Sequence, residues 1–414
     1  MSEFVCTPIM GVKFELTSRY SDPLPVELDA FGLICSAKDR ILNKLVAVKK
    51  ITRPFGSSML AKSALREVKL LRYMRHENII GLADVFITPQ EDLYIVTDLM
   101  WTNLQVLIAK GPLHSDFAKC FLYQILRGLK YVHSAGIIHR DLKPHSILID
   151  ENCDLRICDF GHARLQDFKM TGYVATRYYR APEIMLNWQE YSEKVDIWGA
   201  ACILAEMLRG TPLFPANSHP DQFALFVNLL GNPSEHIVDK IKNNNTRAFV
   251  QSLPKCERRP LAETFPEMDR EALDILERML SFDVDERISA EVALSHPYVA
   301  TYHDPTDEPV VDSPFDWRFD NAEVNIEAWK TAVIKEVLFF RQQALHRRQQ
   351  ITLRNAIIDA TQGHVPPTII DTTKEHIPPP APVAAFPVMG IEEFTPPEED
   401  DFCDDISAFI HDFN

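Results

Sequence analysis

Residues 139–148 read HRDLKPHSIL and place an acid close to a lysine in one short segment. Asp141 is followed two residues later by Lys143, so a proton acceptor lies beside a cation. Such a pair suits phosphoryl transfer, in which catalysis consists mainly of positioning and charge neutralisation. A loop of this kind usually carries a metal-binding Asn at position 146, where this sequence has Ser. The stretch therefore predicts a phosphotransferase and also questions its strength.

Three further motifs supply the remaining parts of that chemistry. Lys49 ends the strand-like run VAVK, and Glu67 lies on the following predicted helix, where its carboxylate can fix the lysine ammonium. Asp159 begins the triplet DFG, whose carboxylate suits Mg²⁺. The triplet APE follows at 181–183. Each motif is weak alone, but all of them in this order make coincidence very improbable.

Composition bounds the class of protein. A chain of 414 residues is too long for one ordinary core, so two lobes or domains are expected. No apolar run reaches the ~18–20 residues needed to span a bilayer, and we expect neither a membrane anchor nor a secretory signal. The net charge of −16 argues against direct nucleic-acid binding. The eight cysteines are scattered without a CxxC pair, which favours reduced thiols in the cytosol or nucleus.

Hydrophobic periodicity divides the chain into a strand-rich and a helix-rich part. Residues 14–53 and 91–100 read as strands, with a helix predicted at 60–75 between them. From about residue 115 a helical stripe begins, with Ser115 as its expected N-cap, and further helices are predicted near 195–209, 221–230 and 271–280. The pattern predicts an α+β fold with a small strand-rich lobe before a larger helical lobe.

The C-terminal stretch 351–414 differs from the rest of the chain. It contains VPP, IPPPAP and TPP, and residues 361–414 carry eleven acids and one Lys. A segment with so few periodic apolar residues cannot bury enough surface to offset its ordering entropy, so we expect it to be disordered.

Taken together, these motifs resemble the protein kinases, and more closely the mitogen-activated protein (MAP) kinases. Thr171-Gly172-Tyr173 and the following VATRYYRAPE match the dual-phosphorylation lip of the stress-activated branch. Residues 1–345 are similar throughout to fungal osmostress MAP kinases of the high-osmolarity-glycerol pathway, as in FELTSRYSD and FDWRF. The resemblance implies a bilobal kinase domain at 20–299, with lobes at about 20–100 and 101–299, and an extension at 300–350.

The resemblance also assigns roles to individual residues. It implies catalysis by Asp141, Lys143 and Lys49, and Mg²⁺ binding by Asp159 and Ser146. The residues it implies for ATP binding are Val26, Glu27, Leu28, Asp29, Ala30, Phe31, Gly32, Leu33, Ile34, Lys49, Glu67, Thr97, Asp98 and Met100. Thr171 and Tyr173 would be phosphorylated by an upstream dual-specificity kinase, and Arg66, Arg140, Arg177 and Arg180 would bind those phosphates. Asp304, Asp307 and Glu308 would form an acidic patch for substrates and phosphatases with basic docking motifs.

The rest of what the resemblance implies concerns context. It predicts a monomer that phosphorylates Ser/Thr-Pro sites in osmotic-stress signalling, with transcription factors among its candidate substrates. It also predicts residence in both cytoplasm and nucleus.

The glycine-rich loop departs most clearly from the family. Relatives read roughly VGMGAFGLV where this chain reads VELDAFGLI, so Glu27 and Asp29 replace two glycines. A carboxylate near the ATP phosphates opposes binding, and at ~6 Å with an effective dielectric of ~20 one such pair costs roughly 3 kcal/mol. His145 and His162 also replace common family residues, a change that reads as neutral substitution.

Three interpretations follow from this mixture. An active but impaired kinase is favoured, because Lys49, Glu67, Asp141, Lys143 and Asp159 all survive. A pseudokinase acting as scaffold or competitor in the same pathway is the alternative. A partner in transcription that acts through the acidic, Phe-containing tail is the third.

Overall fold

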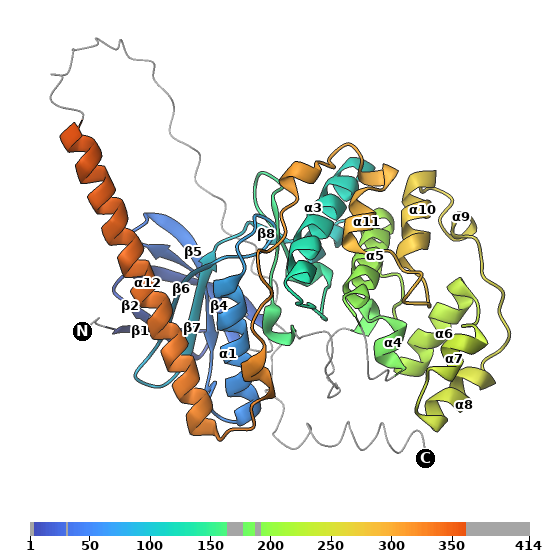
Figure 1. The fold of residues 1–414 in the computed structure, drawn as a ribbon, viewed down its shortest axis with the longest axis horizontal. Coiled ribbons are helices and arrows are strands. Elements are labelled where there is room, and N and C mark those ends of the chain that lie inside the picture. Colours follow the sequence, from blue (N-terminus) through green and yellow to red (C-terminus); the bar gives the residue numbers. More distant parts are fainter. Residues whose placement is uncertain (1–3, 30–31, 164–176, 187–191, 362–414) are drawn as a thin grey trace, which may run out of the picture.

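The computed structural model describes residues 4–29, 32–163, 177–186 and 192–361. Within them the chain forms two lobes, a strand-rich one and a helical one, as the sequence predicts (Figure 1). The strands are β1 (Phe4–Ile9), β2 (Val12–Thr17), β3 (Tyr20–Asp29), β4 (Gly32–Asp39), β5 (Lys44–Ile51), β6 (Leu82–Ile87), β7 (Leu93–Asp98), β8 (Thr102–Asn103), β9 (Ile147–Ile149) and β10 (Leu155–Ile157). The helices are α1 (Ser58–Tyr73), α2 (Leu104–Ile108), α3 (Ser115–Ser134), α4 (Pro182–Met185), α5 (Lys194–Arg209), α6 (His219–Leu230), α7 (Glu235–Asp239), α8 (Asn244–Ser252), α9 (Leu261–Thr264), α10 (Arg270–Met279), α11 (Ala290–Leu294) and α12 (Ile326–Thr361).

The first lobe is built on an antiparallel five-stranded sheet in the order β3-β4-β5-β7-β6. One face is covered by the β1–β2 hairpin through an aromatic cluster, in which Phe14 meets Tyr94 edge-on at 5.2 Å and Phe86 stacks on Tyr94 at 5.0 Å. Apolar residues of α1, including Leu65 and Val68, belong to a second and larger core. The sheet therefore lies between two apolar layers, and Lys49 of β5 reaches toward α1.

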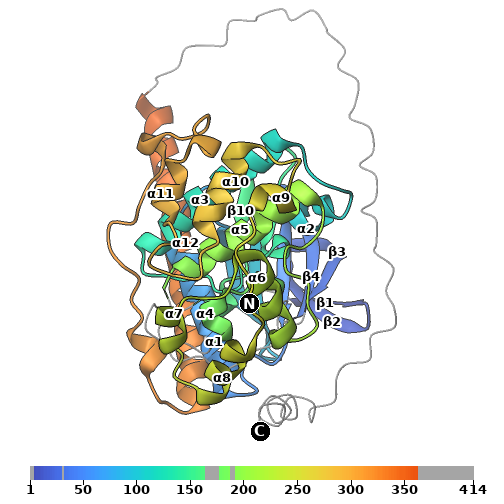
Figure 2. The same ribbon diagram turned by 90° about the vertical axis from the view of Figure 1, so that its right-hand side faces the viewer.

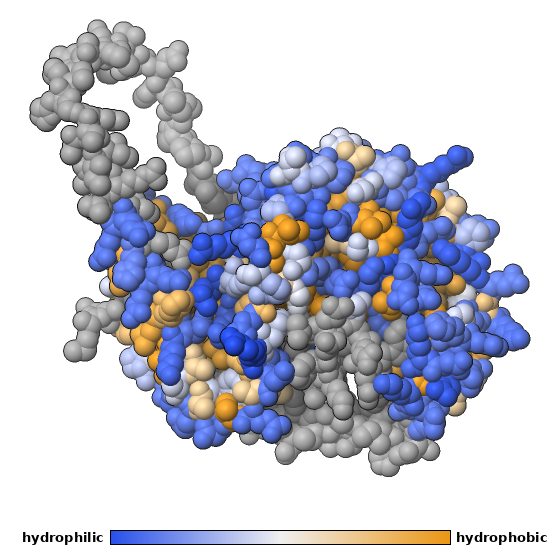
Figure 3. All heavy atoms as spheres, in the orientation of Figure 1, coloured by the Kyte–Doolittle hydropathy of each residue, from blue (hydrophilic) through white to orange (hydrophobic). Residues whose placement is uncertain are grey.

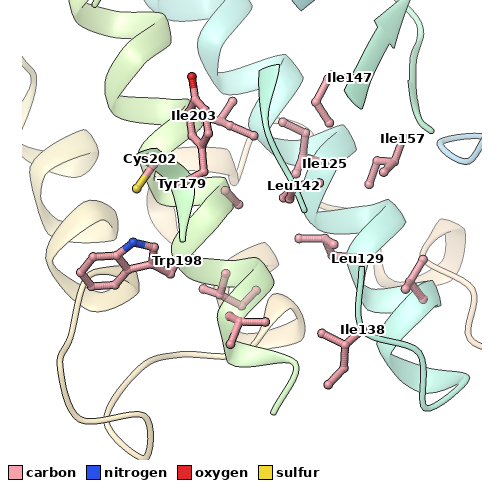
Figure 4. Packing of buried hydrophobic residues seen from close by; sticks show 14 of the residues in the cluster. Ile125, Leu129, Ile138, Leu142, Ile147, Ile157, Tyr179, Trp198, Cys202 and Ile203 are labelled. Carbon is pink, nitrogen blue, oxygen red and sulfur yellow. The ribbon is translucent and has the colours of Figure 1, made fainter. Parts of the chain in front are cut away.

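The second lobe packs around α5, which is buried along almost its whole length. Figure 4 shows the packing of Trp198, Cys202, Ile203, Tyr179, Leu142, Ile125 and Leu129. Trp198 is fully buried and stacks on Phe214 at 5.7 Å. A core of this density holds the short strands β9 and β10, and with them the loops that precede and follow these strands.

Helix α3 begins one residue away from the expected cap. Ser115 was predicted as the N-cap, but it is the first helical residue, and the cap is His114, whose Nδ1 accepts from the backbone N–H of Asp116 at 3.4 Å. The prediction was wrong because an imidazole nitrogen can satisfy the free N–H groups of a first turn as a hydroxyl does.

Helix α12 returns from the second lobe and packs against α1 and the β6 edge of the sheet (Figures 1 and 2). Glu336 accepts from Arg72 and pairs with Lys69 at 3.2 Å, which joins the two helices by charge as well as by apolar contact. The helix runs to Thr361, so residues 351–361, which the sequence analysis placed in the tail, are helical. The remainder of that tail lies outside the described residues.

The surface seen in Figure 3 is mostly hydrophilic, with separate apolar groups rather than one broad patch. None of the helices in the described ranges combines the length and apolar character that crossing a bilayer requires.

A fully buried ion pair fixes the start of α4 to the second lobe. Arg287 donates from both terminal nitrogens to the two carboxylate oxygens of Glu183, at 2.7 and 3.0 Å, and neither side chain is exposed. A two-pronged contact of this kind is geometrically specific. Glu183 belongs to the APE triplet, so the pair anchors the segment that follows the predicted phosphorylation lip.

Replacing Arg287 with Leu is expected to lower the free energy of unfolding by about 3–5 kcal/mol, because Glu183 would keep a buried charge without its partner. The measurement is urea unfolding followed by circular dichroism. Arg278→Leu is the matched control, since Arg278 pairs with Asp274 at 3.0 Å on the surface and should change stability by at most about 1 kcal/mol. Equal losses in the two variants would contradict the anchoring role.

Candidate active site

One strand, one helix and the DFG turn bring the first predicted residues together. Lys49 lies in β5 and Glu67 in α1, and their side chains meet with Nζ 3.0 Å from Oε1. The same ammonium lies 4.0 Å from Oδ1 of Asp159. Residues more than a hundred positions apart in the sequence thus form one charged cluster between the sheet and α1. The contact with Lys49 also fixes the position of α1.

The catalytic loop presents its acid and its cation as a pair. Nζ of Lys143 lies 2.7 Å from Oδ2 of Asp141, and both side chains are mostly buried. Arg140, just before them, has a left-handed backbone with φ of +72°. Such a conformation is uncommon for a residue with a side chain and is maintained only where the surroundings fix it.

Asp196 of α5 is what fixes it, and the sequence analysis missed this residue. Its carboxylate accepts from the backbone N–H groups of His139 and Arg140, each at 2.8 Å, and contacts His133 at 2.9 Å. Burial alone would raise the pKa of Asp196, but the hydrogen bond with His133 and the donors from the loop lower it. An acid at the start of the otherwise apolar helix sequence DIWGAACILA was the signal that could have revealed it.

The DFG triplet is held from both lobes. Asp159 has a left-handed backbone with φ of +66°, and Phe160 is fully buried with its ring edge-on to His139 at 4.9 Å. His139 Nε2 in turn lies 2.8 Å from the carbonyl oxygen of Cys158. Ser63 of α1 donates to the carbonyl of Gly161 at 3.3 Å. The Asp159 carboxylate is therefore aimed at Lys49 by contacts on either side of it.

The two predicted magnesium ligands differ in their suitability. The carboxylate of Asp159 is the hard oxygen donor that Mg²⁺ prefers, and it lies between Lys49 and the catalytic loop. Ser146 is 1% exposed, and its hydroxyl accepts from Lys143 N at 3.1 Å and donates to Lys143 O at 2.9 Å. The structure thus favours Asp159 as a ligand and uses Ser146 to close the turn at 144–146.

The β3–β4 hairpin is the part of the first lobe that covers the cleft between the lobes, and it is called the roof below. Among its described positions, Gly32 is the one that requires glycine. Gly32 has φ of +147°, and a Cβ there would lie 1.8 Å from the carbonyl oxygen of Lys50. Glu27 lies in a strand position opposite Ile34 and is not among the residues with positive φ. Its side chain therefore adds bulk and charge without backbone strain.

The remaining roof residues follow the strands. The strand β3 carries Val26 and Leu28, and β4 carries Leu33 and Ile34. The backbone of Asp29 pairs with that of Gly32. The predicted residues Ala30 and Phe31 lie outside the described part of the chain, and so does the side chain of Asp29.

The predicted hinge residues lie at the end of β7 and just beyond it. Thr97 and Asp98 are the last two residues of β7, with Thr97 opposite Ala47, and Met100 lies two residues after the strand ends. Asp98 accepts from Lys44 of the first lobe at 2.5 Å and from Arg156 of the second at 2.6 Å. Burial would raise the pKa of Asp98, but the hydrogen bonds from these two cations lower it. The hinge is thus braced on both sides of the cleft.

The predicted phosphate-binding arginines do not all face one point. Burial is the main cause that lowers the pKa of Arg180. The nearby positive charge of Arg177 lowers it further. Arg140 lies in the catalytic loop, whereas Nη2 of Arg66 lies 2.5 Å from Asp320 in the C-terminal extension. Thr171, Gly172 and Tyr173 lie outside the described residues, and so does the side chain of His162.

The acidic docking patch contains two exposed acids and one buried acid. Asp304 is exposed and caps its own turn through Thr306, and the carboxylate of Asp307 is 68% exposed beside Arg127. The carboxylate of Glu308 is fully buried, where it binds Lys130 at 3.3 Å and His303 at 2.7 Å. Glu308 therefore does not present its carboxylate at the surface of the predicted patch, because Lys130 and His303 hold it inside the fold.

Comparisons with known proteins agree with this geometry. A family model described as "Protein kinase domain" matches residues 30–299. "Mitogen-activated protein kinase HOG1" of Cochliobolus heterostrophus is 58% identical over 338 residues, covering 82% of this chain and 95% of that protein. The protein of the same name from Cryphonectria parasitica and hog-1 of Neurospora crassa are each 57% identical over 338 residues, covering 82% of this chain and 94% of each relative.

The matched range begins just after the two roof positions that lost glycine, and it includes the lysine–glutamate pair, the catalytic loop and the DFG triplet. The chain therefore belongs to the protein kinase family and, within it, to the mitogen-activated protein kinases related to fungal HOG1.

Proposed function

We propose that this chain is a proline-directed Ser/Thr protein kinase of osmotic-stress signalling, activated by phosphorylation of Thr171 and Tyr173. The observation that carries the proposal is the simultaneous presence of two pairs, Lys49–Glu67 at 3.0 Å and Lys143–Asp141 at 2.7 Å. The first orients a cation for the α- and β-phosphates of ATP, and the second places a base and a cation where the γ-phosphate would be transferred.

Each of these residues has a definite task in the proposed reaction. Asp141 would accept the proton of the substrate hydroxyl, and Lys143 would offset charge on the moving phosphoryl group. Asp159 would hold Mg²⁺, which supplies neutralisation of the nucleotide phosphates when bound. The main chain of Asp98–Met100 would bond adenine beneath Thr97, with Val26 and the rest of the roof above it.

The proposal extends to partners in a limited form. An upstream MAP kinase kinase would modify the lip, and Arg140, Arg177 and Arg180 would receive the new phosphates. Asp304 and Asp307 would attract the basic docking segments of substrates and phosphatases. Arg66 would join the phosphate clamp only after leaving Asp320. The protein would act as a monomer in the cytoplasm and nucleus.

A pseudokinase role is the second candidate, and two observations favour it. The Ser146 hydroxyl is taken up by the main chain of Lys143, and Glu27 places a carboxylate on β3 where the family pattern has glycine. Both features would weaken nucleotide binding without disturbing the lip or the docking surface.

The primary test is transfer of phosphate to a peptide that contains a Ser/Thr-Pro site. Dually phosphorylated protein is expected to label it with Mg²⁺ and ATP, and Asp141→Asn should lower the rate by about a hundredfold or more. Asp285→Asn, at an exposed acid of the second lobe, should leave the rate unchanged. A parent rate no higher than that of Asp141→Asn would refute the proposed function.

A binding test separates the enzyme from the pseudokinase. ATP with Mg²⁺ is expected to raise Tm in a concentration-dependent way, because a ligand that binds only the folded state stabilises it. Lys49→Met should abolish that rise, since it removes the cation held by Glu67. If saturating ATP with Mg²⁺ leaves the parent Tm unchanged, the pseudokinase reading is correct.

Restoring the family residues at the departures should raise activity. The variant Glu27→Gly/Asp29→Gly/Ser146→Asn is expected to gain about tenfold in kcat/KM, because it removes two carboxylates near the phosphates and supplies an amide ligand. Asp22→Gly, an acid-to-glycine change elsewhere in β3, is the matched control and should have no effect. An unchanged kcat/KM in the triple variant would show that the roof acids do not limit the reaction.

A further inference from the structure

Two of the departures from the family touch each other across the cleft. Oε1 of Glu27, on strand β3 of the first lobe, lies 2.7 Å from Nε2 of His145, in the 3-10 turn at Pro144–Ser146 of the second lobe. Each residue replaces a small family residue, and the sequence analysis treated them separately. Their contact joins the roof of the nucleotide cleft to its floor.

The contact lies beside the groups that would handle the phosphates. His145 comes two residues after Lys143, which bonds Asp141. The contact therefore occupies part of the space between the roof and the catalytic loop.

The contact with Glu27 determines how the His145 ring is oriented. The Nδ1 atom is buried and has no hydrogen-bond partner within the described ranges, so Glu27 provides the polar contact that orients the ring. The side chains of His145 and Glu27 are 35% and 36% exposed, so the contact lies near the solvent-facing edge of the cleft.

The pairing of β3 with β4 is irregular next to Glu27. β3 carries register shifts between Ser21 and Leu24 and between Pro25 and Glu27, so its pairing with β4 is irregular just before the contact. Irregular pairing allows a strand to bend locally. The irregularity of β3 just before Glu27 is therefore local, and the pairing of β4 with β5 stays regular.

We propose that Glu27 and His145 form a latch that holds the roof against the catalytic loop and must open before ATP with Mg²⁺ can enter. This inference rests on the proposed function, since it assigns the cleft to ATP. His145 is then a positioning residue, acting on the nucleotide through Glu27, and its presence accounts for part of the impairment expected from the altered loop.

The size of the effect follows from the exposure of the pair. A contact of two partly exposed side chains favours the latched state by about two- to fivefold. A ligand that binds only the open state has its affinity lowered by the fraction of open molecules, so opening the latch should strengthen binding by about the same factor.

The test is a double-mutant cycle on the full chain, with His145→Ser, Glu27→Ala and the two combined. The probe is a fluorescent ATP analogue with Mg²⁺, followed by stopped flow and by equilibrium titration. His145→Ser is expected to raise the association rate and the affinity about two- to fivefold in the parent, and to change neither when Glu27 is already Ala. His236→Ser, at an exposed histidine of α7, is the control and should change neither.

Two results would overturn the latch. Weaker nucleotide binding in His145→Ser would mean that the imidazole shields the nucleotide from the Glu27 charge instead of blocking entry. An equal gain from His145→Ser in the parent and in Glu27→Ala would mean that His145 acts independently of Glu27.

Hydrogen exchange without nucleotide separates the latch from the proposed function. Backbone amides of residues 24–29 and 32–34 should exchange faster in both single variants than in the parent. If they do and no variant binds the nucleotide analogue, the assignment of the cleft to ATP fails while the contact itself stands, and the nucleotide part of this inference falls with it. If the analogue binds but exchange and binding are unaltered in His145→Ser, the latch is refuted and the kinase assignment survives.

Discussion

The structure depends above all on the position of α1, and the contact between Lys49 and Glu67 defines that position on the cleft side. The helix carries Glu67 to the strand lysine, Ser63 to the carbonyl of Gly161, and apolar residues into the core. On its outer side, Asp320 and Glu336 of the C-terminal extension hold Arg66 and Arg72. Because one helix makes both sets of contacts, the cleft and the extension cannot be rearranged independently.

The second lobe uses a different device to position its chemistry. A single buried carboxylate, Asp196, accepts hydrogen bonds from the backbone N–H groups of the residues just before Asp141, the proposed base, and so keeps Arg140 in an unfavourable backbone conformation. The proposed base and the acid that supports its loop therefore come from different elements, and the buried helix α5 fixes the conformation of the loop.

Short motifs and hydrophobic periods were enough to predict the lobes, the main helices and the charged residues of the cleft, since those features are local in sequence. They could not reveal which side chains are already engaged in contacts within the fold. The hydroxyl of Ser146 is used by the turn, Glu308 is neutralised inside the fold, and Arg66 is held by Asp320, each through a contact that no spacing encodes. The same holds for Glu27 and His145, which are more than a hundred residues apart and look unrelated in the sequence.

The contrast between Gly32 and position 27 has a practical consequence for chemical selectivity. At Gly32 the carbonyl of Lys50 leaves no room for any side chain, so a molecule designed for this roof finds only backbone there. Position 27 instead offers a carboxylate that reaches into the cleft, and relatives with glycine there have no equivalent. A cleft-binding compound with a basic group placed to reach Glu27 would therefore discriminate this kinase from those relatives by a single charge.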